Sequence, residues 1–182
     1  MRIEHQYRIG VEWTGNRGEG TSGYKAYGRE GLVTADGKPV LECSADRAFR
    51  GDADRWNPED LLVAALSQCH MLSYLHAAVR HGVVITAYRD EAIGVMVQTP
   101  DGGGRFRSVT LHPVVEVADP ASADLAQSLH AEASAQCFIA ASVNFPVEHE
   151  PRTTVAPERA QELAQPAAGS GQQASRPGRV TG

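Results

Sequence analysis

The 182-residue chain is poor in cysteine, and it lacks both an apolar run at its N-terminus and an excess of basic residues. Three cysteines without a secretory signal indicate a cytoplasmic protein in which any disulfide is transient rather than structural. With a net charge of −5, the protein lacks the positive electrostatic field that would attract the phosphate backbone of a nucleic acid. Nucleic acid is therefore not an expected partner.

The sequence also has none of the spacings that are typical of metal ligands. No CxxC or HxxxH pair occurs in it. Cys69 and His70 are neighbours, so on a helix their side chains would point about 100° apart and would chelate a metal poorly. We expect no bound metal and no resident cofactor, and we interpret His70 and Gln68 as residues that hydrogen-bond between packed helices.

The stretch 57–82 is nearly free of charge, since no formally charged side chain occurs between Leu61 and Val79. Asn57 predicts a helix cap, Pro58 suits the first helical position, and Gly82 suits the end. Apolar residues lie almost all round this helix, which predicts burial on most sides. Five polar residues interrupt it, so we do not expect it to span a membrane; they are Ser67, Gln68, His70, Ser73 and His76.

Around this helix the pattern predicts two antiparallel sheets and a second helix, an α+β fold. The expected strands cover residues 2–13, 24–34, 40–43, 83–98, 106–117 and 142–149. The second helix starts at Asp119-Pro120. From residue 151 the composition shifts to Ala, Gln, Gly, Pro, Ser and Arg, which predicts a domain over 1–150 and a disordered tail over 151–182.

Cys69 lies in the middle of the central helix, and Cys137 closes the apolar face of the second helix. Two such thiols allow three interpretations: small core residues, metal ligands or a redox pair. The redox interpretation needs a thiolate, which an apolar helix disfavours by raising the pKa of the thiol. Cys69 also lies roughly 16 Å from the start of the helix, where the dipole gives little help.

A cation would therefore have to come to Cys69. Arg17, in a loop with four glycines, is a candidate, and Glu59 could hold the guanidinium in a two-pronged contact. Glu59 and Cys69 are ten residues apart, however, which spans about 15 Å along a straight helix. Three arrangements remain open: a broken helix, an arginine that bridges the gap, or partners from two chains.

The segment NPEDLLVAALSQCH resembles the signature of the OsmC/Ohr family, the osmotically inducible and organic hydroperoxide resistance proteins. In that pattern Asn-Pro-Glu precedes a central helix, and the peroxidatic cysteine lies ten residues after the Glu. The region AEASAQCFIAASVNFPVEHEP around Cys137 resembles the region of the second family cysteine. The glycine loop with Arg17 resembles the arginine loop. Phe138 stands where many relatives have proline, and the segment is closer to a divergent OsmC-like branch.

The resemblance implies a thiol peroxidase that reduces organic hydroperoxides, and hydrogen peroxide as a further substrate, in oxidative or osmotic stress. Cys69 would become a sulfenic acid, and Cys137 would resolve it to a disulfide. An external dithiol similar to dihydrolipoamide, on a thiol reductant protein or a lipoylated protein, would reduce the disulfide. Arg17 would stabilise the thiolate and the developing alkoxide, and Glu59 would orient Arg17.

The fold implied is an intertwined homodimer, in which antiparallel sheets wrap around central helices. The alternative function is a non-catalytic OsmC-like dimer that binds a small apolar ligand between its helices.

Overall fold

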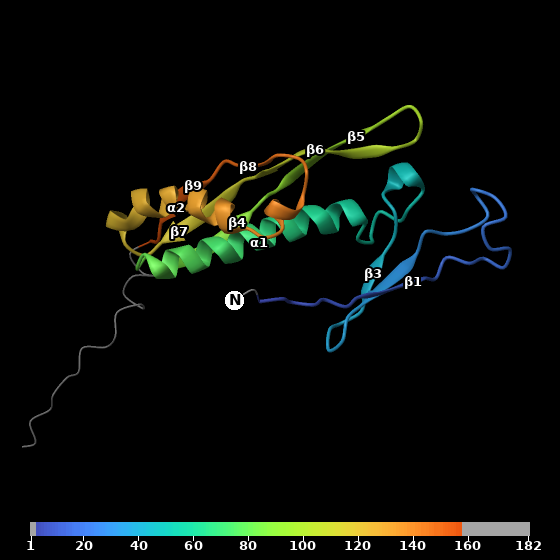
Figure 1. Ribbon diagram of the computed structural model, residues 1–182, viewed down its shortest axis with the longest axis horizontal. Helices are drawn as coiled ribbons and strands as arrows, with labels where there is room; N and C mark the ends of the chain where they lie inside the picture. The colour runs from blue at the N-terminus through green and yellow to red at the C-terminus, as the bar shows by residue number, and fades with distance from the viewer. Residues whose placement is uncertain (1–2, 158–182) are drawn as a thin grey trace, which may run out of the picture.

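The computed structural model describes residues 3–157, which form an α+β fold (Figure 1). The strands are β1 (Gly10–Trp13), β2 (Gly31–Thr34), β3 (Leu41–Cys43), β4 (Ile85–Asp90), β5 (Ile93–Gln98), β6 (Gly104–Leu111), β7 (Pro113–Val117), β8 (Val147–His149) and β9 (Arg152–Val155). The α-helices are α1 (Pro58–Arg80) and α2 (Ala123–Gln136), and short 3-10 turns cover Arg47–Phe49, Pro120–Ser122 and Ala140–Ser142. The predicted fold class is confirmed.

The strands form three small sheets, ordered β1-β2-β3, β4-β7-β9 and β5-β6-β8. Neighbouring strands are antiparallel except for β8 beside β6 and β9 beside β7, which are parallel. Figure 1 shows α2 and the strands β4 to β9 along one side of α1, whereas the β1-β2-β3 sheet lies beyond the N-terminal end of α1. The opposite side of α1 is left open.

The central helix α1 begins and ends as predicted. The Asn57 side chain accepts a hydrogen bond of 2.7 Å from the backbone N–H of Asp60, which satisfies one of the free donors of the first turn. The helix continues without interruption for 23 residues and stops before Gly82, whose φ of +70° places it in the left-handed region. The broken-helix arrangement is thereby excluded.

The prediction that α1 is buried on most sides is wrong for the single chain. Five of its residues are buried, and they lie on the side of α2 and the sheets: Leu66, His70, Tyr74, Ala77 and Ala78. On the opposite side Leu72 and Val79 are 57% and 77% exposed. By length and composition α1 could cross a membrane, but core helices of soluble proteins pass the same test.

Two hydrophobic clusters hold α1 in place. One joins its C-terminal half to α2 and β7 through Tyr74, Ala78, Val115, Leu129 and Ala133. The other packs Leu66 against Val109 and Leu111 of β6, with Phe106 and Phe145 at its margin. The part of α1 that carries Cys69 lies between these clusters.

Several predicted strands are shorter than expected. Among the described residues of the predicted strand 2–13 only Gly10–Trp13 pair, and in 24–34 only Gly31–Thr34 pair. The stretches 83–98 and 106–117 each divide into two strands that belong to different sheets. The division is stabilised by Asp90, whose carboxylate accepts hydrogen bonds from the Ser67 hydroxyl (2.5 Å) and the His112 backbone N–H (2.7 Å).

The prediction that a disordered tail begins at residue 151 is wrong for Arg152–Val155, which form β9 beside β7. The Thr154 hydroxyl donates to the Val115 carbonyl at 3.0 Å, and Ala156 is buried. The segment Arg152–Val155 therefore belongs to the fold and not to the tail. Residues 158–182, where the rest of the predicted tail falls, lie outside the described residues.

Candidate functional site

The fold brings the Cys69 and Cys137 side chains close enough together that Cys69 contributes to the pKa of Cys137, although 68 positions separate them in the sequence. Cys69 is half-buried on α1. Cys137 is 2% exposed and ends α2, where its extended backbone terminates the helix. The α1–α2 packing around Tyr74 and Leu129 places the end of α2 against the middle of α1.

The surroundings of Cys137 keep its thiol protonated. Burial, followed by the neighbouring Cys69 thiol, raises the pKa of Cys137 to about 11. The Ala140 backbone N–H, 3.5 Å from the Cys137 sulfur, acts in the opposite direction. Two thiols in this arrangement can form a disulfide without a large movement, and Cys137 is inert as a nucleophile until it loses its proton.

Arg17 lies in the glycine loop, where its side chain is 63% exposed. The Asn16 side chain accepts hydrogen bonds from Gly18 and Gly20 N–H, and both glycines take positive φ values. The guanidinium lies 3.6 Å from the Glu30 carboxylate. Within one chain, the described contacts therefore pair Arg17 with Glu30 and not with Glu59 or Cys69.

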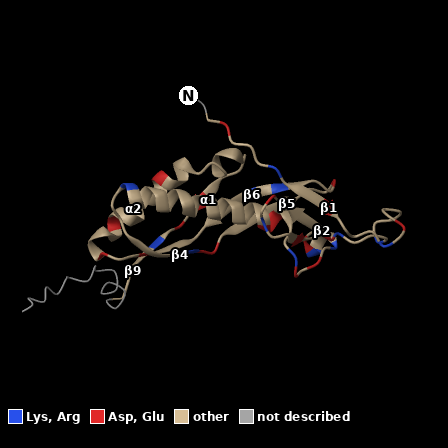
Figure 2. Ribbon diagram, turned by 90° about the horizontal axis from the view of Figure 1, so that it is seen from below, with Lys and Arg blue, Asp and Glu red and all other residues tan. Residues whose placement is uncertain are grey.

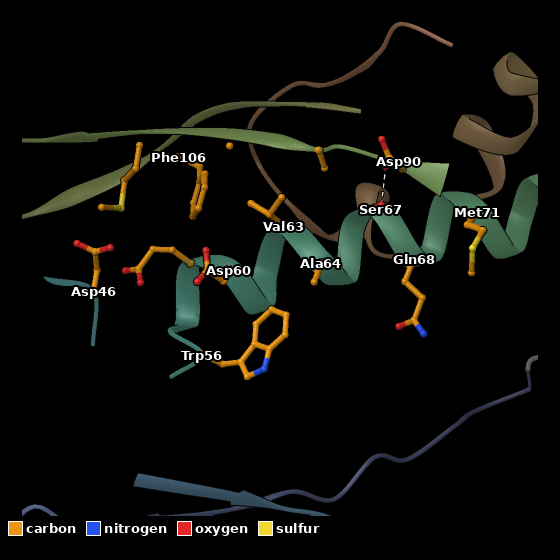
Figure 3. A pocket seen from close by; sticks show the side chains of 14 residues that line it. Asp46, Trp56, Asp60, Val63, Ala64, Ser67, Gln68, Met71, Asp90 and Phe106 are labelled. Carbon is orange, nitrogen blue, oxygen red and sulfur yellow. Dashed lines mark hydrogen bonds between the residues drawn. The ribbon is translucent and has the colours of Figure 1, made fainter. Parts of the chain in front are cut away.

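Glu59 lies in the first turn of α1, and its Oε2 atom is buried without a hydrogen-bond partner among the described residues. It borders a groove of about 850 Å³ that follows the N-terminal half of α1 (Figure 3). The carboxylates that line the groove are those of Asp46, Glu59, Asp60 and Asp90, and no lysine or arginine is among its fourteen lining residues. A buried carboxylate oxygen without a donor indicates that a partner is missing.

One wall of this groove is apolar. In Figure 3 Val63 of α1 and Phe106 of β6 point toward one another, while Trp56 and Gln68 lie on the other side of the helix. Gly94 of β5 permits this packing, since a Cβ there would come within 2.7 Å of both Val63 and Phe106. The groove thus has an apolar side under the sheet and an open side along α1.

Sequence reasoning missed a buried histidine cluster beside the thiols. His70 Nε2 lies 3.0 Å from His130 Nδ1, and the rings of Tyr74 and His149 pack against them. Burial, followed by the neighbouring histidines, lowers the pKa of His130 to about 3. Burial and His149 lower that of His70 to about 4, against the attraction of Asp90. The expected hydrogen bond of His70 between the helices is confirmed. Nothing in the sequence indicated that His130 and His149 would form a cluster with His70.

The histidines do not complete a metal site. Among residues 3–157, no group of three or more His, Cys, Asp or Glu side chains has an arrangement that could hold a metal ion. The chemistry that the described residues support at this site is therefore that of the two thiols.

A family model described as OsmC-like protein matches residues 51–152, more than half of the chain. The chain belongs to the OsmC-like family. The match includes Glu59, Cys69 and Cys137, but it begins after Arg17. No curated protein matches the sequence.

Solved structures with the same fold include an OsmC-like protein of unknown function from Vibrio cholerae, with 28% identity and a TM-score of 0.72 over 81% of this chain and 99% of that chain. An organic hydroperoxide resistance protein from Elizabethkingia anophelis has 21% identity and a TM-score of 0.59, over 85% and 100%. Another from Bacillus subtilis has 19% identity and a TM-score of 0.55, over 82% and 98%. At these two lower identities the likeness shows the fold alone.

Proposed function

We propose that this OsmC-like protein is a thiol-dependent peroxidase that reduces organic hydroperoxides through Cys69 and Cys137. The observation that carries the proposal is the proximity of a half-buried and a fully buried thiol on two packed helices. A peroxidatic and a resolving thiol must come together in this way to form a disulfide.

The reaction begins with the Cys69 thiolate. It attacks the distal oxygen of the hydroperoxide, the O–O bond breaks, and the alkoxide leaves as an alcohol after it takes a proton. Cys69 is then a sulfenic acid. The Cys137 sulfur, on losing its proton, attacks the Cys69 sulfur, and the hydroxide leaves as water. An external dithiol reduces the disulfide by exchange and is itself oxidised to a disulfide.

A second copy of the chain supplies the arginine in this proposal. The uninterrupted α1 keeps Glu59 about 15 Å from Cys69 of the same chain. A twofold axis near Ala64, an exposed small residue on α1, would place Glu59 of each copy opposite Cys69 of the other. The Arg17 loop of one copy would then pair with the unsatisfied Glu59 carboxylate and stabilise the thiolate, so an intertwined homodimer completes the site.

The remaining expectations belong to the same proposal. The protein needs no resident cofactor, because the electrons come from a dithiol similar to dihydrolipoamide, on a thiol reductant or a lipoylated protein. It works in the cytoplasm in defence against oxidative or osmotic stress, without binding nucleic acid or a membrane. The apolar wall of the groove, with Val63 and Phe106, favours an organic peroxide over hydrogen peroxide.

The test is mass analysis of the reduced protein after one equivalent of cumene hydroperoxide or hydrogen peroxide, quenched over seconds. We expect a loss of two hydrogens, a Cys69–Cys137 linkage, and faster reaction with cumene hydroperoxide. Cys69→Ser should abolish the reaction, and Cys137→Ser should accumulate the sulfenic acid. Cys43→Ser serves as the matched control, because this half-buried thiol lies on β3 and is given no role.

Full peroxide turnover in Cys69→Ser would overturn the proposal. Slow oxidation spread over Cys43 and the methionines would do the same, and would favour the non-catalytic dimer that binds an apolar ligand in the groove.

A further inference from the structure

The hydrogen bond between His70 and His130 is a buried link between the two helices that carry the thiols. His70 follows Cys69 on α1, and His130 precedes Cys137 by seven residues, or about 10 Å, on α2. The two histidines are 2% and 1% exposed. Their rings are nearly parallel, with an interplanar angle of 12°.

The rest of the buried helix contact combines Tyr74 and Leu129 with small apolar side chains, and the Tyr74 hydroxyl donates a hydrogen bond of 3.1 Å to the Ala126 carbonyl. Ala77 and Ala78 of α1 and Ala126 and Ala133 of α2 are all at most 1% exposed. Alanine contacts are non-directional and do not by themselves select one sliding position of α2 along α1. A slip of one residue would move the end of α2 by about 1.5 Å and turn it by about 100°, which is enough to separate the thiols.

The histidine pair is not an efficient way to stabilise the folded state. The second ring nitrogen of His130, Nε2, is buried without a partner among the described residues. Such an atom costs free energy, and two apolar side chains of similar volume would avoid that cost. Buried polar pairs that are kept at such a cost are known to fix the register of packed helices.

We propose that His70 and His130 are positioning residues that fix the register of α2 on α1 and so hold Cys137 against Cys69. This positioning role rests on the proposed function, because it serves the step in which Cys69 and Cys137 form a disulfide. It does not rest on peroxide chemistry for its test.

The test is the thiol–disulfide equilibrium with dithiothreitol. In this reaction Cys69 and Cys137 transfer two electrons and two protons to oxidised dithiothreitol, and one protein disulfide and one reduced dithiothreitol result. The fraction of the linked form is measured by mass at neutral pH over a range of dithiothreitol ratios, in the full chain with Cys43→Ser. It reports how well the two thiols are positioned, whether or not a peroxide reacts.

Four variants separate positioning from stability. His70→Leu and His130→Leu each break the bond and orphan the other ring, so both should lower the equilibrium constant for the disulfide at least tenfold, or about 30 mV. The double variant leaves no orphaned ring, so its free energy of unfolding should recover, but its disulfide constant should stay low. Glu132→Gln is the control, because it alters the contacts of a partly exposed carboxylate with Arg80 and His81 between the same helices.

A double variant that folds and keeps the disulfide constant of the unaltered protein would overturn the proposal. Equal losses in Glu132→Gln and His130→Leu would also overturn it, because they would show a general effect of helix packing. A protein that fails to react with peroxide but shows the expected dithiothreitol constants would refute the proposed function and leave the positioning role intact.

Discussion

At the scale of residues, the two thiols of the site have different surroundings and therefore different tasks. Cys137 is held as a thiol by burial and by Cys69, and it is inaccessible to a peroxide from outside. Cys69 is half-buried and therefore more accessible, although it is not among the residues that line the groove. This asymmetry favours Cys69 as the residue that meets the substrate and Cys137 as the one that resolves.

We predict that Cys137 reacts with iodoacetamide at neutral pH at least about a hundredfold more slowly than an ordinary peptide thiol. Its pKa of about 11, against an ordinary value of 9.0, reduces the thiolate fraction by that factor, and burial slows access further. The rate should rise about tenfold per pH unit and level off only near pH 11. Peptide mass analysis of the reduced protein measures it, with Cys43 as the internal comparison. A plateau below pH 9 would contradict the raised pKa.

The residues that the sequence could predict are those whose signal is local. The cap at Asn57, the stop at Gly82 and the ten-residue spacing from Glu59 to Cys69 all lie within one helix. The Glu30 partner of Arg17 and the His130 partner of His70 depend on which segments fold together. A single sequence does not show which distant segments pack together, so the extent of the histidine cluster could not be predicted from it. The hydrogen-bonding role of His70 was the part that could be predicted.

At the scale of elements, the same limit explains the divided strands. Alternation predicts that a stretch is extended, but it does not show where a chain leaves one sheet and enters another. Here the transition depends on the carboxylate of Asp90, which receives bonds from α1 and from His112. The sequence prediction missed β9 for a related reason, because its four residues form a strand by pairing with β7.

The packing of α1 on α2 should depend on pH through its histidines. The pKa values of His70 and His130 are lowered from 6.5 to about 4 and about 3, so the unfolded chain binds more protons between pH 6.5 and 3. Their neutral forms face Tyr74 of α1 and His149 of β8, and Asp90 of β4 acts on His70. Stability is therefore complete above pH 6.5 and is lost as the pH falls below it.

We predict that the free energy of unfolding falls by about 3 kcal/mol between pH 7 and pH 4, which counts the protonation of one of the two neighbouring histidines, because charge repulsion then disfavours the second. Denaturant titrations over this range measure the change. In the double variant with His70→Leu and His130→Leu, most of this slope should disappear. An equally steep loss in that variant would assign the acid sensitivity to the carboxylates instead.

At the scale of the whole molecule, the single chain leaves unusual surfaces uncovered. Six of the eight exposed positions of α1 fall three or four residues apart and form one stripe: Asp60, Ala64, Gln68, Leu72, His76 and Val79. Figure 2 shows no charged residue along the middle of α1. All four residues of β1 are exposed, with Val11 at 76%. Apolar surface of this extent indicates a partner, and the unsatisfied Glu59 lies at one end of the stripe.

The proposed dimer predicts the effect of a charge in this stripe. With a twofold axis near Ala64, Leu72 of one copy lies opposite Trp56 of the other, and both are about half exposed in the single chain. Leu72→Asp would bury a carboxylate without a partner, which should weaken association at least a hundredfold, or about 3 kcal/mol. Light scattering after size-exclusion chromatography should then give the mass of one chain, and peroxide reduction should fall because Arg17 of a second copy is absent.

The control for this substitution is Leu125→Asp, which places the same charge on a 41% exposed leucine of α2, away from the stripe. It should keep the mass of two chains and the activity. If the unaltered protein has the mass of one chain, or if Leu72→Asp keeps the mass of two, the α1 stripe is not the interface. Arg17 would then have to reach Cys69 within its own chain. For this its ion pair with Glu30 would have to break, and the glycine loop would have to move across the exposed side of α1.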